Sequence, residues 1–237
     1  MSQETEILQK VPLFAGLPAE ALTALAGRLR RRKMPAGTPV VYKGDPSGAL
    51  YLIVSGRVKV HQATAGGDEV ILDILGPGGF FGEMSLIDGG PRSADISTLE
   101  AVEVLLLEGD ALQKTVTEQP AVAWTLLQIL SRRVRDQNER AEILMTRDVA
   151  GRVADCLLRL ANTQGTPLPS GSSYPTGSIR IDVSLTQSDL AALIGATRER
   201  VSRALTAFRT SGALQWDKDA SRWIICNPAT LAKRAEM

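Results

Sequence analysis

The chain has 237 residues, 44% of them hydrophobic and 22% charged, which suits two modest domains with buried cores. The start of the sequence lacks the pattern of a signal peptide, and no apolar run approaches the length of a membrane span, so we expect a cytoplasmic protein. Residues 1–150 hold 16 Lys and Arg against 19 Asp and Glu, whereas residues 151–237 hold 11 against 7. The basic C-terminal part suggests an anionic partner.

Cysteine and histidine are too few for most metal sites. Cys156 and Cys226 lie far apart and outside metal-ligand spacing, so we interpret both as reduced core residues. His61 is the single histidine, which gives little support to a histidine-based metal site or to Ser-His-Asp catalysis. We therefore expect no metal, and we find no nucleophile–base pair or Walker loop that would indicate an enzyme.

The N-terminal half changes its pattern near residue 34. Residues 13–33 are predicted to form a helix, because leucines recur at helical spacing and the segment ends in bases, which suit a helix C-terminus. We interpret the four bases Arg30 to Lys33 as its solvated end. From residue 34 to 110, short alternating apolar runs are separated by turn signals about every ten residues. This pattern predicts an antiparallel β-sandwich or roll.

One turn of this β region carries a lone acid and a lone base, in the sequence FFGEMSLIDGGPRSAD. Glu83 and Arg92 lie on either side of a Gly-Gly-Pro turn, and they could simply pair with each other. The alternative is a cradle for a small ligand. Arg92 would hold a phosphate with help from the Ser93 hydroxyl, and Glu83 would accept from a ribose 2′-hydroxyl. Gly82 would let the backbone approach the ligand, and a short helix is expected at GEMSL.

Helix returns at Leu112 and continues well beyond Pro120. Six positions in it follow the 3,4,3,4,3 spacing of a heptad seam: Leu127, Leu130, Val134, Gln137, Ala141 and Leu144. This face either packs against its own domain or forms a dimer seam. Gln137 places an amide in the middle of the seam, where it either fixes the register or meets a polar group.

The C-terminal part contains the sequence SLTQSDLAALIGATRERVSRALTAFRTSGAL, after an amphipathic helix at residues 148–162 and a Pro-, Gly- and Ser-rich loop at residues 163–178. Thr186 and Asp189 predict a capping box for a first short helix, Gly195 a turn, and Thr197 the cap of a second helix. The expected buried positions are Ala191, Leu193 and Ile194 on the first helix, and Val201, Leu205 and Phe208 on the second. This is the helix-turn-helix pattern.

The outer face of the second helix carries Arg198, Glu199 and Arg203, which can hydrogen-bond base edges in a major groove. An exposed helix with a Glu199–Arg203 pair is the alternative. Four hydroxyls are candidates for phosphate contacts: Thr186, Ser188, Thr197 and Ser202. Two strand-like runs in GALQWDKDASRWIICN predict a hairpin like the wing of winged-helix DNA binders, with Trp216 and Trp223 in its core.

The sequence resembles transcription regulators of the cyclic-AMP receptor protein and fumarate–nitrate reductase regulator family, over most of its length. The resemblance rests on KGDPSGALYLIVSGRVKV, FGEMSLIDGGPRSA, RRVRDQNERAEILMTRDVAGRVADCLLRLA and GATRERVSRAL. These segments are similar to the family's β-roll signature, its phosphate-binding cassette, its dimer helix with the first helix of the DNA domain, and its recognition helix.

The resemblance implies an α+β fold: an N-terminal antiparallel β-roll of jelly-roll type in residues 1–119, a long dimerisation helix in residues 120–146, and a winged helix-turn-helix domain in residues 147–237. It implies that the ligand is cyclic AMP and that its site is built by nine residues: Gly82, Glu83, Met84, Arg92, Ser93, Ala94, Arg133, Gln137 and Asn138. The cyclic-AMP receptors typically have Thr-Ser or Thr-Asn where this chain has Gln137 and Asn138, so the contact to adenine departs from the family pattern.

The resemblance also implies a homodimer that binds double-stranded DNA at a TGTGA-like inverted repeat, with RNA polymerase as a further partner. By the same comparison, Arg198, Glu199 and Arg203 match the base-contacting positions. Two alternatives stay open at this point. One is a DNA-binding protein of the same fold that acts without a nucleotide or with another ligand, and the other is a cyclic-nucleotide module that does not act on DNA.

Overall fold

The computed structural model describes residues 2–46 and 48–236. The chain divides into two compact units, residues 1–62 with 72–137 and residues 63–71 with 138–237. No helix in the described residues is both long and apolar enough to cross a membrane.

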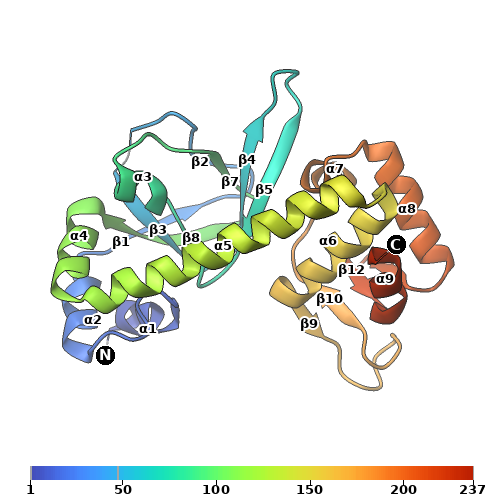
Figure 1. Cartoon of the computed structure of the whole chain (residues 1–237). Helices are drawn as coiled ribbons and strands as arrows, with labels where there is room; N and C mark the ends of the chain where they lie inside the picture. Colours follow the sequence, from blue (N-terminus) through green and yellow to red (C-terminus); the bar gives the residue numbers. More distant parts are fainter. Residues whose placement is uncertain (1, 47, 237) are drawn as a thin grey trace. The chain divides into compact units, whose positions relative to one another are not determined.

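The N-terminal part is a β-roll of two antiparallel sheets (Figure 1). One sheet has the strand order β1-β8-β3-β6 and the other β2-β7-β4-β5. The strands are β1 (Arg30–Met34), β2 (Pro39–Val41), β3 (Ala49–Ser55), β4 (Val58–Ala63), β5 (Glu69–Leu75), β6 (Phe80–Phe81), β7 (Asp95–Thr98) and β8 (Val102–Glu108). Six of them, β2, β3, β4, β5, β7 and β8, lie in the apolar runs that the sequence marked as strands.

Several helices pack against the first of these sheets and connect the roll to the rest of the chain. They are α1 (Gln3–Lys10), α2 (Ala19–Ala26), α3 (Glu83–Asp88), α4 (Gly109–Glu118) and α5 (Pro120–Thr146). The short helix expected at GEMSL is α3. The helix expected to run from Leu112 through Pro120 is interrupted at Gln119, between the end of α4 and the start of α5. The helix α1 and the strand β6 were not predicted.

The central strands β3 and β8 bury both of their faces, because successive side chains of a strand point to opposite sides. On β3, Leu50 and Leu52 belong to a core shared with the helices, where Phe14 is fully buried. Tyr51 and Ile53 belong to a second core, which includes side chains of both sheets. The roll therefore has one core inside it and another beneath its helices.

The prediction of one helix over residues 13–33 is wrong at both ends, because α2 begins only at Ala19. The helix α2 ends at Ala26, and the bases Arg30 to Lys33 belong to β1, which pairs with β8. Arg31 forms an ion pair with Glu103 of β8, and Lys33 lies 3.7 Å from the same carboxylate. Because β1 lies at the sheet edge, its charged side chains can reach solvent, and such charges are common on edge strands.

The C-terminal part contains the two helices of the predicted helix-turn-helix and a small antiparallel sheet of order β11-β12-β10-β9. Its elements are α6 (Val149–Gln164), β9 (Gly165–Pro167), β10 (Ile179–Ile181), α7 (Gln187–Ile194), α8 (Arg198–Thr210), β11 (Leu214–Asp217), β12 (Arg222–Ile225) and α9 (Pro228–Ala235). The stretch 163–178, expected to be a loop, contains the end of α6 and the short strand β9, which pairs with β10. The fold class predicted from the sequence is otherwise confirmed.

Both cysteines are buried and free, as the sequence suggested. Burial raises the pKa of the Cys156 thiol to about 11, so this group stays protonated and unreactive at neutral pH. In residues 2–46 and 48–236, no group of three or more His, Cys, Asp and Glu is placed to hold a metal ion.

Candidate nucleotide pocket and DNA-binding interface

Gly82 is the residue that lets the cassette form. It precedes α3 with φ of +89°, a conformation that side chains rarely adopt. A Cβ at this position would overlap the Arg92 guanidinium and would lie 2.8 Å from the carbonyl oxygen of Ala49. The group that approaches the Gly82 backbone is therefore the side chain of Arg92, whereas the sequence suggested that this glycine would let the backbone approach a ligand.

Arg92 is a buried cation, with 6% of its surface exposed. Its guanidinium donates to the carbonyl oxygen of Gly82 at 2.9 Å, to that of Ala49 at 2.8 Å and to the hydroxyl of Ser85 at 3.0 Å. These acceptors are all neutral, and no ion pair joins Arg92 to an acid of the described residues. A buried guanidinium without a counter-charge favours an anionic ligand, since burying an uncompensated charge is costly.

Glu83 pairs with Arg133 and not with Arg92, so the simple pairing considered from the sequence is wrong. The Arg133 guanidinium donates to the Glu83 carboxylate at 2.6 Å and to the carbonyl oxygen of Phe80 at 2.9 Å. It also lies over the Phe80 ring, 4.8 Å from the centroid. The Glu83 side chain is 5% exposed, whereas that of Arg133 is 31% exposed. The acid is thus enclosed from one side by α5.

The remaining cassette residues differ in exposure. Ser93 is exposed, and its hydroxyl lies 3.6 Å from the sulfur of Met84, which is 50% exposed. Ala94 is buried. The structure therefore brings six of the predicted site residues together on or beside α3: Gly82, Glu83, Met84, Arg92, Ser93 and Arg133. Ser85, which holds Arg92, was missed, because a serine inside a short helix carries no sequence signal of such a contact.

Gln137 and Asn138 lie exposed on α5, about one turn beyond Arg133. The heptad seam that contains Gln137 is also largely open: Leu127 is 56% exposed, Val134 59% and Leu144 47%. Val122 and Leu126 make the buried face of α5 instead. Most of the seam is therefore open, although Leu130, which also belongs to it, is partly buried against the core beneath the helices.

The helix-turn-helix forms as its caps predict. The Thr186 hydroxyl accepts from the Asp189 amide and the Asp189 carboxylate accepts from the Thr186 amide, which is the expected capping box. Gly195 adopts φ of +60° in the turn, and Thr197 caps α8. On α7, Leu190 is buried where Leu193 was expected and Leu193 is only partly covered. The five other positions expected to be buried in this motif are buried: Ala191, Ile194, Val201, Leu205 and Phe208.

The outer face of α8 presents Arg198, Glu199 and Arg203 to solvent. No ion pair joins Glu199 to Arg203 in the described structure, so the two side chains are not held together as the alternative required. The backbone amide at the start of α8 and the Thr197 hydroxyl, with smaller effects of Arg198 and Arg203, lower the pKa of Glu199. Glu199 is consequently a charged acceptor at neutral pH, which suits contact with cytosine N4.

Three of the four predicted phosphate contacts fall at the starts of the two helices, and Ser202 lies about one turn into α8. Thr186, Ser188 and Thr197 are exposed, and Ser202 is partly covered on α8. The hydroxyls of Thr186 and Thr197 also serve as helix caps. Donors at helix starts are suited to phosphate oxygens, which fix register without specifying sequence.

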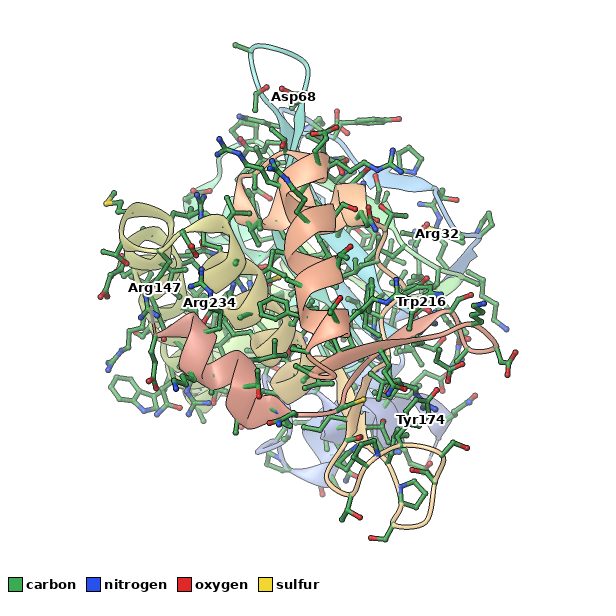
Figure 2. The ribbon with its side chains drawn as sticks, turned by 90° about the vertical axis from the view of Figure 1, so that its right-hand side faces the viewer. Arg32, Asp68, Arg147, Tyr174, Trp216 and Arg234 are labelled. Carbon is green, nitrogen blue, oxygen red and sulfur yellow. The ribbon has the colours of Figure 1, made fainter. Side chains whose placement is uncertain are left out.

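The predicted wing is the hairpin of β11 and β12. Trp216 and Trp223 lie opposite each other in its register, with ring centroids 4.8 Å apart and planes at 67°. Figure 2 shows Trp216 on this hairpin. Trp223 is buried and Trp216 is partly covered, so the pair forms hydrophobic core within the wing, as expected.

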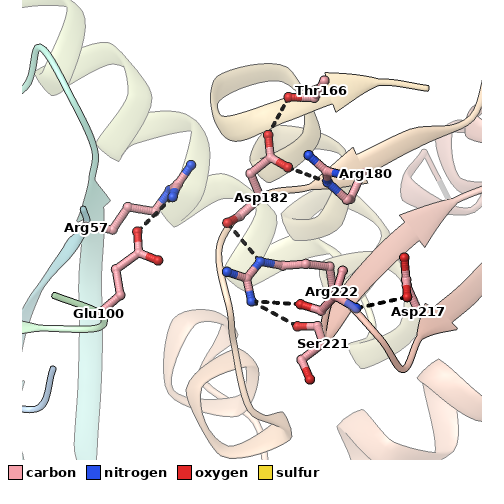
Figure 3. Close-up of polar contacts among 9 residues, drawn as sticks. Arg57, Glu100, Thr166, Arg180, Asp182, Asp217, Ser221 and Arg222 are labelled. Carbon is pink, nitrogen blue, oxygen red and sulfur yellow. Dashed lines mark hydrogen bonds and ion pairs between the residues drawn. The ribbon is translucent and has the colours of Figure 1, made fainter. Parts of the chain in front are cut away.

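The wing is anchored to the preceding strands through Arg222 and Asp182 (Figure 3). The Arg222 guanidinium donates to the Asp182 carbonyl oxygen at 3.0 Å, and the Asp182 carboxylate accepts from Arg180 at 2.7 Å. Asp217 accepts from the backbone amides of Asp219 and Ala220 and closes the wing turn. Arg222 and Arg180 are therefore already engaged within the domain.

Two family models match this chain: a cyclic nucleotide-binding domain over residues 31–119 and a Crp-like helix-turn-helix domain over residues 151–234. The chain is 36% identical over 230 residues to the CRP-like cAMP-activated global transcriptional regulator of Mycobacterium tuberculosis, covering 97% of this chain and 99% of that protein. It is 36% identical over 204 residues to the cyclic AMP receptor protein of Thermus thermophilus, covering 86% and 88% of the two chains.

Among solved structures, the crystal structure of the Thermus thermophilus catabolite activator protein matches 95% of this chain and 98% of its own, with a TM-score of 0.52 and 34% identity. The relative in Mycobacterium tuberculosis is described as a transcriptional regulator and not as an enzyme. The Crp-like helix-turn-helix also removes support for a nucleotide-binding module that does not act on DNA. The chain belongs to the cyclic-AMP receptor protein and fumarate–nitrate reductase regulator family, as a DNA-binding transcription regulator with a cyclic nucleotide-binding domain.

Proposed function

We propose that the protein is a cyclic-AMP-gated regulator that binds a TGTGA-like inverted repeat as a homodimer. Residues 1–119 would form the nucleotide-binding domain, residues 120–146 the dimerisation helix and residues 147–237 the DNA-binding domain. Its place would be the cytoplasm, where bacterial DNA lies. RNA polymerase would be its further partner, by resemblance to the family.

The observation that carries the ligand assignment is the buried Arg92 guanidinium, which has neutral acceptors and no counter-charge. A cyclic phosphate bears a single negative charge and offers oxygens to such a group. Arg92 would hold that phosphate with the exposed Ser93 hydroxyl, and Met84 and Ala94 would line the cassette. Gly82 keeps the space beside Arg92 free of a side chain.

Glu83 and the α5 residues would hold the rest of the nucleotide. Glu83 would accept from the ribose 2′-hydroxyl while it keeps its ion pair to Arg133. Gln137 and Asn138 are exposed, and their amides would bond the adenine edge. The two relatives at 36% identity are described as a cAMP-activated regulator and as a cyclic AMP receptor, which supports cyclic AMP over other nucleotides.

The exposed heptad seam of α5 would pair with the same seam of a second chain. Leu127, Val134 and Leu144 would leave solvent in the dimer, and Gln137 would fix the register or meet the nucleotide. Nucleotide binding would shift the dimer toward a state in which both α8 helices face adjacent major grooves, about 34 Å apart. A ~100-fold gain in DNA affinity requires about 2.7 kcal/mol of coupling.

Arg198 and Arg203 would donate to guanine, and Glu199 would accept from cytosine. Thr186, Ser188, Thr197 and Ser202 would contact phosphates. This assignment is supported by the exposure of the three charged side chains on one helix of the Crp-like domain.

Calorimetric titration with cyclic AMP tests the ligand assignment. Wild-type protein is expected to bind, Arg92→Gln to lose binding, and Ser93→Ala to bind more weakly. Far-UV circular dichroism and a melting curve show whether each variant is folded. Binding of cyclic AMP that is unchanged in a folded Arg92→Gln variant would remove the cassette as the phosphate site.

A regulator of the same fold that acts without a nucleotide is the second candidate. The Glu83–Arg133 ion pair favours it, because this contact already gives the acid of the cassette a partner within the chain. If this candidate is correct, Arg92→Gln changes only the stability of the protein. Cyclic AMP then has no effect on the DNA affinity of either the wild type or the variant.

A further inference from the structure

A shallow cavity, largely open to solvent, lies between the C-terminal half of α8 and the strand β11. Its volume is about 540 Å³, and its lining residues are Thr206, Arg209, Thr210, Leu214, Gln215 and Trp216. None of these residues is among those proposed to contact DNA. The cavity is lined by one cation and several polar side chains, and no acid lines it.

Two of the donors that line this cavity, Arg209 and Gln215, are available to a ligand. Neither Arg209 nor Gln215 forms a side-chain hydrogen bond or ion pair with another described residue, and both are exposed. The threonine hydroxyls donate instead to carbonyl oxygens of their own helix, from Thr206 at 2.9 Å and from Thr210 at 3.0 Å. A guanidinium and an amide without acceptors favour an anionic oxygen ligand.

Arg209 could alternatively serve only as a favourable cation at the end of α8. The last carbonyl oxygens of the helix already have other donors: the Ser211 hydroxyl and the Ala213 amide bond the Phe208 oxygen, and the Gly212 amide bonds the Arg209 oxygen. The guanidinium is therefore not needed to satisfy the helix end. The nearby wing cation Arg222 is engaged with Asp182, which leaves Arg209 as the basic group of the cavity (Figure 3).

The cavity continues the face of α8 that carries the base contacts. Glu199, Arg203, Thr206 and Thr210 follow at intervals of four, three and four residues, so they share one side of the helix. A recognition helix lies in the major groove with its N-terminal residues on base edges, and the groove is bordered by the two sugar-phosphate backbones. Trp216, held by its contact with Trp223, would form a rigid wall beside a deoxyribose.

We propose that Arg209 and Gln215 bind a backbone phosphate of the DNA that flanks the bases contacted by α8. The proposal rests on the proposed function, because it assumes that α8 faces the duplex through Arg198, Glu199 and Arg203. The site adds affinity and fixes the register of the domain, and it adds no sequence preference.

The test is anisotropy titration of a TGTGA-type inverted-repeat duplex and a scrambled duplex, with saturating cyclic AMP, between about 50 and 200 mM salt. Arg209→Ala is expected to weaken binding to both duplexes by the same factor, about five- to tenfold. The slope of log affinity against log salt should become shallower by about 0.9 for each protomer. Gln215→Glu, which introduces a carboxylate, should act in the same direction. Lys233→Ala is the matched control, because Lys233 is an exposed cation on α9 that lies outside the cavity.

A duplex with single flanking phosphates replaced by neutral methylphosphonates identifies the contact. One such replacement should weaken DNA binding by the wild-type protein and leave DNA binding by Arg209→Ala unchanged. If Arg209→Ala and Gln215→Glu both match Lys233→Ala while Arg203→Ala abolishes discrimination, the phosphate site is refuted and the α8 interface stands. If Arg203→Ala also has no effect, the assignment of α8 fails and the site fails with it.

Discussion

The Arg133 guanidinium joins α5 to the nearly buried carboxylate of Glu83 at 2.6 Å, although the two residues lie 50 positions apart in the chain. Replacing Arg133 with alanine leaves this acid without a partner. We expect Arg133→Ala to lower the free energy of unfolding by about 1–3 kcal/mol, a value reduced by the partial exposure of Arg133. Urea denaturation measures the change.

A double-mutant cycle with Glu83→Gln isolates the pair. The double variant should lose less stability than the sum of the single variants, because Arg133→Ala no longer strands a charge. Arg57→Ala, which removes an ion pair to Glu100 elsewhere in the roll, is the comparison. Strict additivity of Arg133→Ala and Glu83→Gln would contradict the interaction.

Gly82 and Gly89 flank α3, and both have positive φ, but their surroundings differ. Alanine at residue 82 would overlap the Arg92 guanidinium, whereas alanine at residue 89 would meet nothing within 4 Å. Both changes should cost about 1–2 kcal/mol for the backbone conformation alone. We expect Gly82→Ala to cost more and to weaken cyclic AMP binding in calorimetry, with Gly89→Ala as the matched control. An equal loss of stability and of cyclic AMP binding in both variants would show that binding does not require the free space beside Arg92.

Asp148 caps α6, and its pKa is lowered first by the Gly151 amide and then by the Arg234 guanidinium. Its contribution to stability is fully present above the ordinary pKa of 3.8 and is lost as the pH falls through the lower folded value. Asp148→Ala should therefore reduce stability at pH 7, by about 1 kcal/mol for the loss of an N-cap. The difference from wild type should shrink at more acidic pH.

Asp148→Asn is the control for charge, since its side-chain oxygen can still accept from the Gly151 amide. We expect the free energy of unfolding of Asp148→Asn at pH 7 to lie between those of the wild type and Asp148→Ala. Urea unfolding at several pH values gives the comparison. A stability difference for Asp148→Ala that grows as the pH falls would contradict the sign of this linkage.

Val134 lies in the middle of the exposed seam of α5. Val134→Glu would place like charges opposite each other in the proposed dimer and should convert it to monomers, as measured by light scattering. Met145→Glu is the matched control, because Met145 is 86% exposed and lies outside the heptad positions. Identical masses for all three proteins would argue against pairing through this seam.

The sequence predicted most reliably the features that depend on residues close together in the chain. Thr186 and Asp189 predicted their capping box because both partners lie within one turn, and the wing followed from two short runs around a tight turn. The strands β3 and β8 could be predicted as strands from their apolar runs and flanking turns.

Contacts between distant residues were not predictable in the same way. Arg30 to Lys33 looked like a helix end, and only the pairing with β8 shows that they form a strand. Glu83 and Arg92 could be selected from the sequence as candidate site residues, but their partners in the fold could not, because Arg133 and the carbonyl oxygen of Ala49 come from other elements. A chemical role could be proposed for a single side chain from the sequence, whereas its partners could be identified only from the fold.

The most direct measurement is the anisotropy of a labelled TGTGA-type inverted-repeat duplex titrated with the protein, with and without cyclic AMP, at one fixed salt concentration. The account predicts that cyclic AMP tightens binding to this duplex at least about tenfold relative to a scrambled duplex, which corresponds to about 1.4 kcal/mol of coupling. Specific binding that is indifferent to cyclic AMP would contradict the ligand-gated mechanism and would leave the cassette with another ligand or with none.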